Sequence, residues 1–108
     1  MSVVTDYVIA MCGSCEMDTL SIVSEIQDAL REETGRRPHL SPVPQSATTG
    51  DKQFTGAVLV FALNYCGPEM MRLALRRVCG WNPDHVQVSY CDELESEKGF
   101  QALDGWRT

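Results

Sequence analysis

Gly56-Ala57-Val58-Leu59-Val60-Phe61-Ala62-Leu63-Asn64 holds seven consecutive apolar residues, and this stretch decides the expected fold. A half-buried strand would alternate apolar with polar residues, so an unbroken run rich in Val, Leu and Phe predicts a strand buried on both faces. Tyr7 to Met11 has the same character and completes a first strand expected over Val3 to Met11. We therefore expect two central strands in one sheet.

Each of these strands precedes a stretch with helical periodicity. Glu16 to Thr34 carries apolar residues at helical spacing, and Gly35 is a natural end for that helix. Pro68 suits the first turn of a second helix, where a missing N–H costs nothing, and Gly80 would end it.

The remaining segments predict weaker elements. Arg36 to Val43 is rich in proline and predicts at best a short edge strand. Gln45 to Thr55 is a polar connection, and His85 to Tyr90 alternates as an edge strand does. Asp92 to Asp104 predicts a short acidic helix interrupted by Gly99. Three apolar residues would anchor this last segment on the sheet: Phe100, Leu103 and Trp106.

These elements predict a single α/β domain over residues 1–108. Central strands that are apolar on both faces favour a three-layer fold, with a four-stranded, mostly parallel sheet of strand order 2-1-3-4, as in Rossmann- and flavodoxin-like proteins. The alternative is a ferredoxin-like βαββαβ sandwich, because the Gln45 to Thr55 connection is short and unhelical for a parallel crossover.

Composition excludes several classes of partner. Fifteen acidic and nine basic side chains give a net charge of -6, which disfavours nucleic acids and anionic membranes. No apolar run has the length of a spanning helix, and no basic leader precedes an apolar run at the N-terminus. We expect a cytoplasmic protein with a protein partner and reduced thiols.

Cys12-Gly-Ser-Cys15 lies where the first strand meets the first helix. The positive end of a helix stabilises a thiolate, so this pair predicts a site of thiol redox exchange. Cys12 would be the nucleophile and Cys15 the resolving thiol.

A metal site is a second interpretation of the cysteines, which number five and so cannot all pair in disulfides. In a parallel sheet, Cys66 and Cys91 would meet Cys12 and Cys15 at one edge and could hold zinc or an iron–sulfur cluster. In an antiparallel sheet, Cys66 and Cys91 would lie at the opposite end, and the Cys12/Cys15 pair would stand alone.

The run Val8 to Ser14, the apolar strand Ala57 to Leu63 and the chain length resemble the lactose/cellobiose-type IIB components of the sugar phosphotransferase system. The resemblance implies a cytoplasmic, four-stranded parallel domain that carries phosphate on a cysteine after its first strand. Cys12 matches that cysteine by position, and Thr19 could match a loop hydroxyl. Residues 15–18 depart from the small or hydroxylated residues of the family, and their two carboxylates would repel phosphate.

Arg72 lies six positions after Cys66, which is the spacing of cysteine phosphatase loops. Glu69 lies inside this loop, however, and is placed to form an i, i+3 ion pair with Arg72. The spacing therefore favours a solvated helix face over a phosphate site.

A non-catalytic interaction module with structural cysteines, such as a small regulator or inhibitor, is the competing class of function. Its candidate recognition residues are either acidic or large and apolar. They are Asp92, Glu93, Glu95, Glu97, Met70, Met71 and Trp106.

Overall fold

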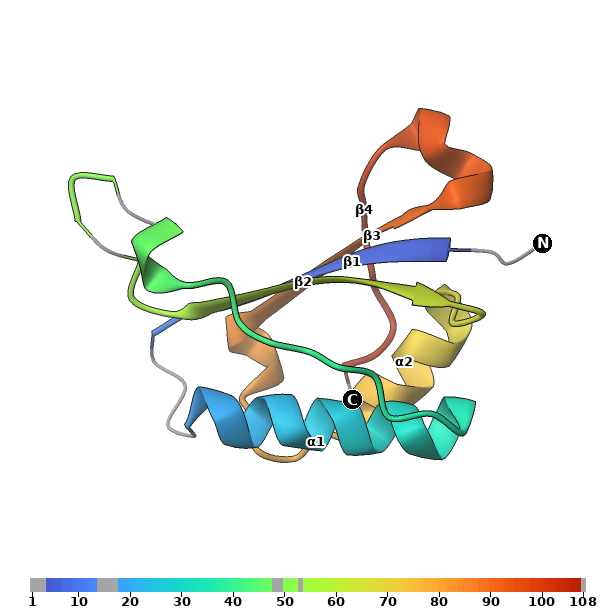
Figure 1. Cartoon of the computed structure of the whole chain (residues 1–108), viewed down its shortest axis with the longest axis horizontal. Coiled ribbons are helices and arrows are strands. Elements are labelled where there is room, and N and C mark those ends of the chain that lie inside the picture. Colours follow the sequence, from blue (N-terminus) through green and yellow to red (C-terminus); the bar gives the residue numbers. More distant parts are fainter. Residues whose placement is uncertain (1–3, 14–17, 48–49, 53, 108) are drawn as a thin grey trace.

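A computed structural model describes residues 4–13, 18–47, 50–52 and 54–107, and it shows one sheet packed over two helices (Figure 1). The strands are β1 (Val4–Met11), β2 (Ala57–Asn64), β3 (Val86–Asp92) and β4 (Gln101–Ala102). The helices are α1 (Thr19–Thr34) and α2 (Pro68–Arg76). Short 3-10 segments are η1 (Gln45–Ala47), η2 (Pro83–His85) and η3 (Glu93–Lys98).

The four strands lie in the order β2-β1-β3-β4, and every neighbouring pair is antiparallel. β1 is central, so Val8 is opposite Val60 on one side and Ser89 on the other. β2 and β3 run in the same direction on either side of β1 and are joined through α2. Together, β2, α2 and β3 form a split βαβ unit. The predicted, mostly parallel sheet is therefore wrong. Its order 2-1-3-4 is wrong as well, because it counted a strand over Arg36 to Val43 as the second, whereas β2 here is Ala57–Asn64. The strand directions are those that the ferredoxin-like alternative requires.

The connection between α1 and β2 explains this outcome. Beyond β2, an isolated antiparallel bridge joins Pro42 to Leu59, and the Val43 N–H donates to the Val58 carbonyl at 2.8 Å. The chain thus runs antiparallel beside the later β2, which begins at Ala57. A reversal needs only a short turn, whereas a parallel crossover needs a dozen residues or more. The predicted edge strand over Arg36 to Val43 is reduced to this single bridge.

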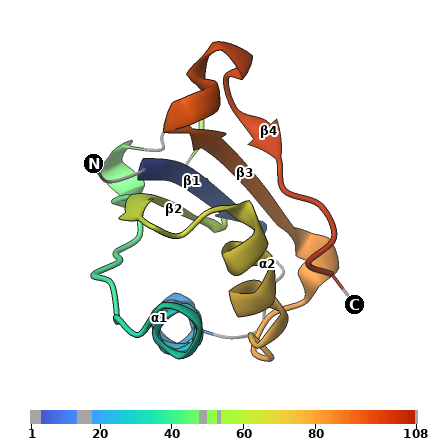
Figure 2. The same ribbon diagram turned by 90° about the vertical axis from the view of Figure 1, so that its right-hand side faces the viewer.

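Both helices cover the same face of the sheet (Figure 2). Along β1, Tyr7, Ile9 and Met11 are buried against the helices, while the residues between them are less buried. The opposite face has no helix over it in the described part of the chain, and Val60 is 59% exposed there. The predicted three-layer fold is wrong because an apolar run does not reveal whether its second face is covered.

Several predicted boundaries are confirmed. Gly35 ends α1 in the left-handed conformation at φ 80°, and its N–H donates to the Arg31 carbonyl at 2.8 Å. Pro68 is the first residue of α2. The predicted helix over Asp92 to Asp104 is wrong: η3 ends at Lys98, and the chain turns at Gly99, φ 66°, into β4.

The C-terminal segment closes the core. Trp106 is 2% exposed, lies 5.5 Å from Trp81 between ring centroids, and has the Arg107 guanidinium 4.6 Å over its ring. Arg72 Nε donates to the Asp104 carbonyl at 2.6 Å. These contacts hold the last described residues against α2. Within the described residues, no helix is long and apolar enough to cross a membrane.

A substitution of Gly56 tests how closely the backbones of β1 and β2 approach each other. A Cβ at this position would lie 1.7 Å from the Met11 carbonyl oxygen, so Gly56→Ala must push the two strands apart. We expect the free energy of unfolding in urea to fall by about 2–4 kcal/mol. Gly50→Ala is the control, because no atom of the described residues lies within 4 Å of its added Cβ, and it should change stability by less than about 0.5 kcal/mol. Equal effects of the two substitutions would contradict the register.

Candidate functional site

Cys12 directly follows β1, and its side chain is exposed. Its expected partner, Cys15, lies outside the described residues. The described helix α1 begins at Thr19, seven positions beyond Cys12. Because the field of a helix terminus fades within one turn, α1 gives Cys12 less support than the sequence pattern predicted.

Cys66 and Cys91 lie at the other end of the sheet from Cys12. Cys91 is opposite Asp6, whereas Cys12 follows Met11 at the far end of β1. Six residues of strand separate these levels, or about 20 Å. The four-thiol metal site depended on a parallel sheet, and that condition is not met. Among the described residues, no group of three or more His, Cys, Asp or Glu side chains could hold a metal ion.

Cys12 borders a cavity of about 350 Å³, together with residues of η2 and the C-terminal segment. The Cys12 N–H donates to the His85 carbonyl at 3.1 Å, which fixes the end of β1 beside η2. Asp84, His85 and Arg107 line the same cavity. The sequence could not reveal this neighbourhood, because its members lie more than 70 positions after Cys12.

Cys66 is a structural cysteine. It is 2% exposed, and burial raises the pKa of its thiol to about 11, so the thiol is neutral at physiological pH. Arg72 pairs with Glu69 at 2.6 Å, as its spacing predicted, and also donates to the Asp104 carbonyl. Arg72 is therefore occupied in holding the C-terminal segment.

A second cavity, of about 360 Å³, lies between the C-terminal end of α1, the end of β2 and the start of α2. Its lining is apolar in one part and polar in another. The residues of interest are Leu30, Leu63 and Met70 in the apolar part, and Glu33, Arg36 and Tyr65 in the polar part.

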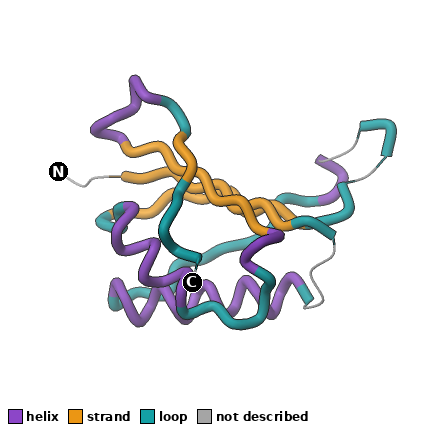
Figure 3. The backbone as a smooth tube through the Cα atoms, turned by 180° about the vertical axis from the view of Figure 1, so that it is seen from behind, coloured by secondary structure: helices purple, strands orange, loops and turns teal. Residues whose placement is uncertain are grey.

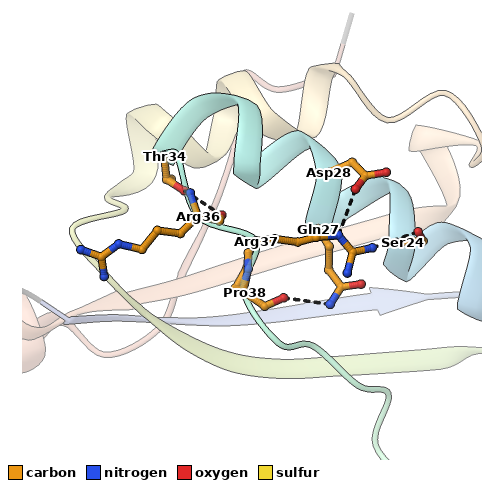
Figure 4. A network of polar contacts seen from close by, with 7 residues as sticks. All are labelled: Ser24, Gln27, Asp28, Thr34, Arg36, Arg37 and Pro38. Atoms are coloured by element: carbon orange, nitrogen blue, oxygen red, sulfur yellow. Dashed lines mark hydrogen bonds and ion pairs between the residues drawn. The ribbon is translucent and has the colours of Figure 1, made fainter.

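Hydrogen bonds within residues 24–38 hold one wall of this second cavity (Figure 4). Gln27 Nε2 donates to the Pro38 carbonyl at 2.8 Å, and the Thr34 hydroxyl donates to the Leu30 carbonyl at 2.7 Å. Arg37 turns back over α1 and pairs with Asp28 at 3.0 Å. The wall is therefore preorganised.

Tyr65 forms part of this cavity in a strained conformation. Its φ is 57°, in the left-handed region that costs a residue with a side chain about 1–2 kcal/mol. The Tyr7 hydroxyl donates to the next carbonyl, that of Cys66, at 2.7 Å, and Tyr7 itself is fully buried. Burial also raises the pKa of Tyr7, so its hydroxyl stays a donor. This buried hydrogen bond holds the peptide beside Tyr65 in place.

The outer face of the sheet is the third candidate surface. We define it as the side chains of β1, β2 and β3 that point away from the helices. They are Val4, Asp6, Val8, Ala10, Val58, Val60, Ala62, Asn64, Gln87, Ser89 and Cys91. Figures 1 and 3 show that η3 and the described residues between Pro44 and Thr55 both project on this side. They carry further exposed apolar side chains, namely Phe54 at 40% and Leu94 at 67%.

Of the four acidic residues that the sequence singled out for recognition, Glu93, Glu95 and Glu97 are exposed on η3, and Asp92 is the half-buried last residue of β3. Trp106 and Met71, also singled out, are core residues at 2% and 0% exposure. The sequence pattern did not predict the outer face, whose apolar residues belong to the two unbroken apolar runs. These runs predicted strands covered on both faces.

Comparisons of this chain with protein-family models, curated proteins and solved structures find no match. The functional conclusion is therefore built on the geometry and chemistry of the described surfaces.

Tyr7→Phe removes the hydrogen bond to the Cys66 carbonyl and leaves that buried oxygen without its donor. We expect the free energy of unfolding in urea to fall by about 1–2 kcal/mol. Tyr90→Phe is the matched control, since the Tyr90 hydroxyl makes only a 3.5 Å contact with Gln101, and it should cost less than about 0.5 kcal/mol. If the two variants were equally stable, the Tyr7 hydroxyl would not hold the β2–α2 turn.

Proposed function

We propose that this protein is a binding module that binds a partner protein on the outer face of its sheet. The partner surface would have an apolar centre surrounded by basic residues. The observation that supports this most directly is the exposure of apolar side chains along that face. Val8 and Val60 are opposite each other, and Ala10 and Val58 form the next row. Contiguous exposed apolar surface on a small protein is typical of a site for another macromolecule.

Charge favours a basic partner. Asp6 lies on the outer face between Ala62 and Cys91, and the adjoining segment 92–98 holds four acids and one base, Lys98. The helix side is close to neutral, because six arginines there face five acids of α1 and α2. The arginines are Arg31, Arg36, Arg37, Arg72, Arg76 and Arg77, and the acids are Glu25, Asp28, Glu32, Glu33 and Glu69. A complementary positive surface would be attracted to the outer face and its acidic border.

The same features disfavour two other occupants. A second copy of the chain meeting this one outer face to outer face would bring Asp6 and the acidic η3 segments together. Single-stranded RNA binds open sheet faces through stacked aromatic residues, whereas Val, Ala and Asp occupy the central positions here.

The test uses the ¹⁵N-labelled full chain and two synthetic amphipathic helical peptides, one of Leu and Lys and one of Leu and Glu. We expect the Leu/Lys peptide to shift the amide resonances of outer-face residues and to bind at least about tenfold more tightly than the Leu/Glu peptide. Val60→Lys should weaken Leu/Lys binding about tenfold by removing apolar contact and adding repulsion. Leu73→Lys on α2, also a half-exposed apolar residue at 48%, should leave it unchanged.

Three results would overturn the proposal: shifts confined to α1 and α2, equal affinity for both peptides, or an unaltered affinity in Val60→Lys. Sedimentation of the chain alone tests whether a second copy of the chain, rather than another protein, covers the outer face. A dimer that Val60→Lys dissociates would assign the outer face to a second copy and contradict a basic partner.

Thiol exchange at Cys12 is a second candidate function, and the exposure of Cys12 beside His85 and Arg107 supports it. The Arg107 guanidinium in the same cavity is a permanent cation, and a neighbouring cation favours the thiolate, which is the reactive form. The phosphocysteine role implied by the phosphotransferase resemblance would use the same sulfur, although the antiparallel sheet differs from the parallel domain of that family. We also propose a cytoplasmic location, which the free thiols of Cys66, Cys79 and Cys91 support.

Alkylation kinetics test the thiol proposal. At neutral pH, iodoacetamide should modify Cys12 faster than Cys79, the matched control that is also exposed, and Cys12→Ser should remove the fast phase. Cys66 should be slowest, because at pH 7 only about one in ten thousand of its thiols is ionised. Equal rates for Cys12 and Cys79 would contradict activation of Cys12.

The raised pKa of Cys66 also determines in which direction pH changes the stability of the fold. The folded chain keeps this thiol protonated to higher pH than the unfolded chain does. Its contribution to stability is therefore complete below about pH 9 and is lost as the pH rises through 11. Alkylation of Cys66 should accelerate over the same interval.

A further inference from the structure

The cavity at the end of β2 combines an apolar floor with one unneutralised cation. Leu30, Leu63 and Met70 supply apolar surface from α1, β2 and α2. Its volume of about 360 Å³ falls within the roughly 300–1,000 Å³ of small-molecule sites. The sequence brings these residues together only through the fold, since 40 positions separate Leu30 from Met70.

The charges around the cavity leave Arg36 available. Arg37 is neutralised by Asp28 at 3.0 Å, and Glu33 by Arg77 at 2.7 Å. The Arg36 side chain extends away from this network in Figure 4, and its guanidinium pairs with no carboxylate among the described residues. A guanidinium binds a carboxylate through two parallel hydrogen bonds, so one anionic ligand group would complete the local charge balance.

Tyr65 supplies a second contact for a ligand. Its ring is 60% exposed at the border of the cavity, and the described structure shows no hydrogen-bond partner for its hydroxyl. The strained backbone at φ 57° places this side chain here, and the Tyr7 bond to the Cys66 carbonyl maintains it. Strain that persists at an exposed aromatic residue is typical of a binding site.

We propose that this cavity binds a small organic carboxylate, with the carboxylate on Arg36 and an apolar ring or chain against Leu30, Leu63 and Met70. A singly charged group fits better than a phosphate dianion, because Arg36 is the one cation of the described lining that no carboxylate pairs with. The wall held by the Gln27–Pro38 hydrogen bond is already formed, so binding needs little further ordering.

The experiment titrates the ¹⁵N-labelled full chain with 3-phenylpropionate and, separately, with its neutral analogue 3-phenylpropanamide. We expect saturable shifts of the amide resonances of Leu30, Thr34, Leu63, Tyr65 and Met70, with a dissociation constant in the millimolar range for so small a probe. The neutral amide should bind about tenfold more weakly, because it loses the charge-assisted hydrogen bonds to Arg36.

Arg36→Gln should reduce the affinity for 3-phenylpropionate about tenfold and leave that for the amide unchanged. Arg31→Gln is the matched control, an exposed arginine of α1 outside the cavity lining, and it should alter neither affinity. Shifts that do not saturate, equal affinity for acid and amide, or no response in Arg36→Gln would each overturn the site. Tighter binding of phenyl phosphate than of 3-phenylpropionate would overturn the carboxylate assignment.

Discussion

The antiparallel pairing of β1 with both of its neighbours is the constraint on which the rest of the structure depends. Since β2 and β3 both run against β1, the residues that directly follow β2 and those late in β3 lie at the end of the sheet where β1 begins. Cys66 and Cys91 therefore lie far from Cys12. The same arrangement places α1 and α2 on one face and leaves the other open (Figure 2).

The two faces of the sheet consequently differ in packing and in charge. The inner face buries Tyr7, Ile9 and Met11 beneath the two helices, and six of the seven arginines lie in these helices or in the residues that follow them. The outer face presents small and β-branched residues beside the acidic η3. The negative charge of the chain is thus denser on the outer side, around Asp6 and η3, than on the helix side, and such a surface steers the encounter with an oppositely charged partner.

One buried side chain connects the core to the cavity at the end of β2. Tyr7 stacks on Phe61 with ring centroids 5.6 Å apart, and its hydroxyl reaches the Cys66 carbonyl beyond the strand. The core therefore supports the left-handed backbone of Tyr65, which a flexible turn would relax. A site built on a packed core in this way loses little entropy when it binds a ligand.

Local sequence determined the elements themselves. Apolar runs located β1 and β2, helical periodicity located α1 and α2, and Gly35 and Pro68 set two boundaries, because these depend on backbone preferences within a few residues. Strand direction was decided only in the tertiary structure. A run that is apolar on both faces is equally compatible with a covered and an open face, and only the short polar connection before β2 indicated a reversal. The outer face, the neighbours of Cys12 and the cavity around Arg36 each join residues distant in sequence, so they exist only once the sheet is assembled.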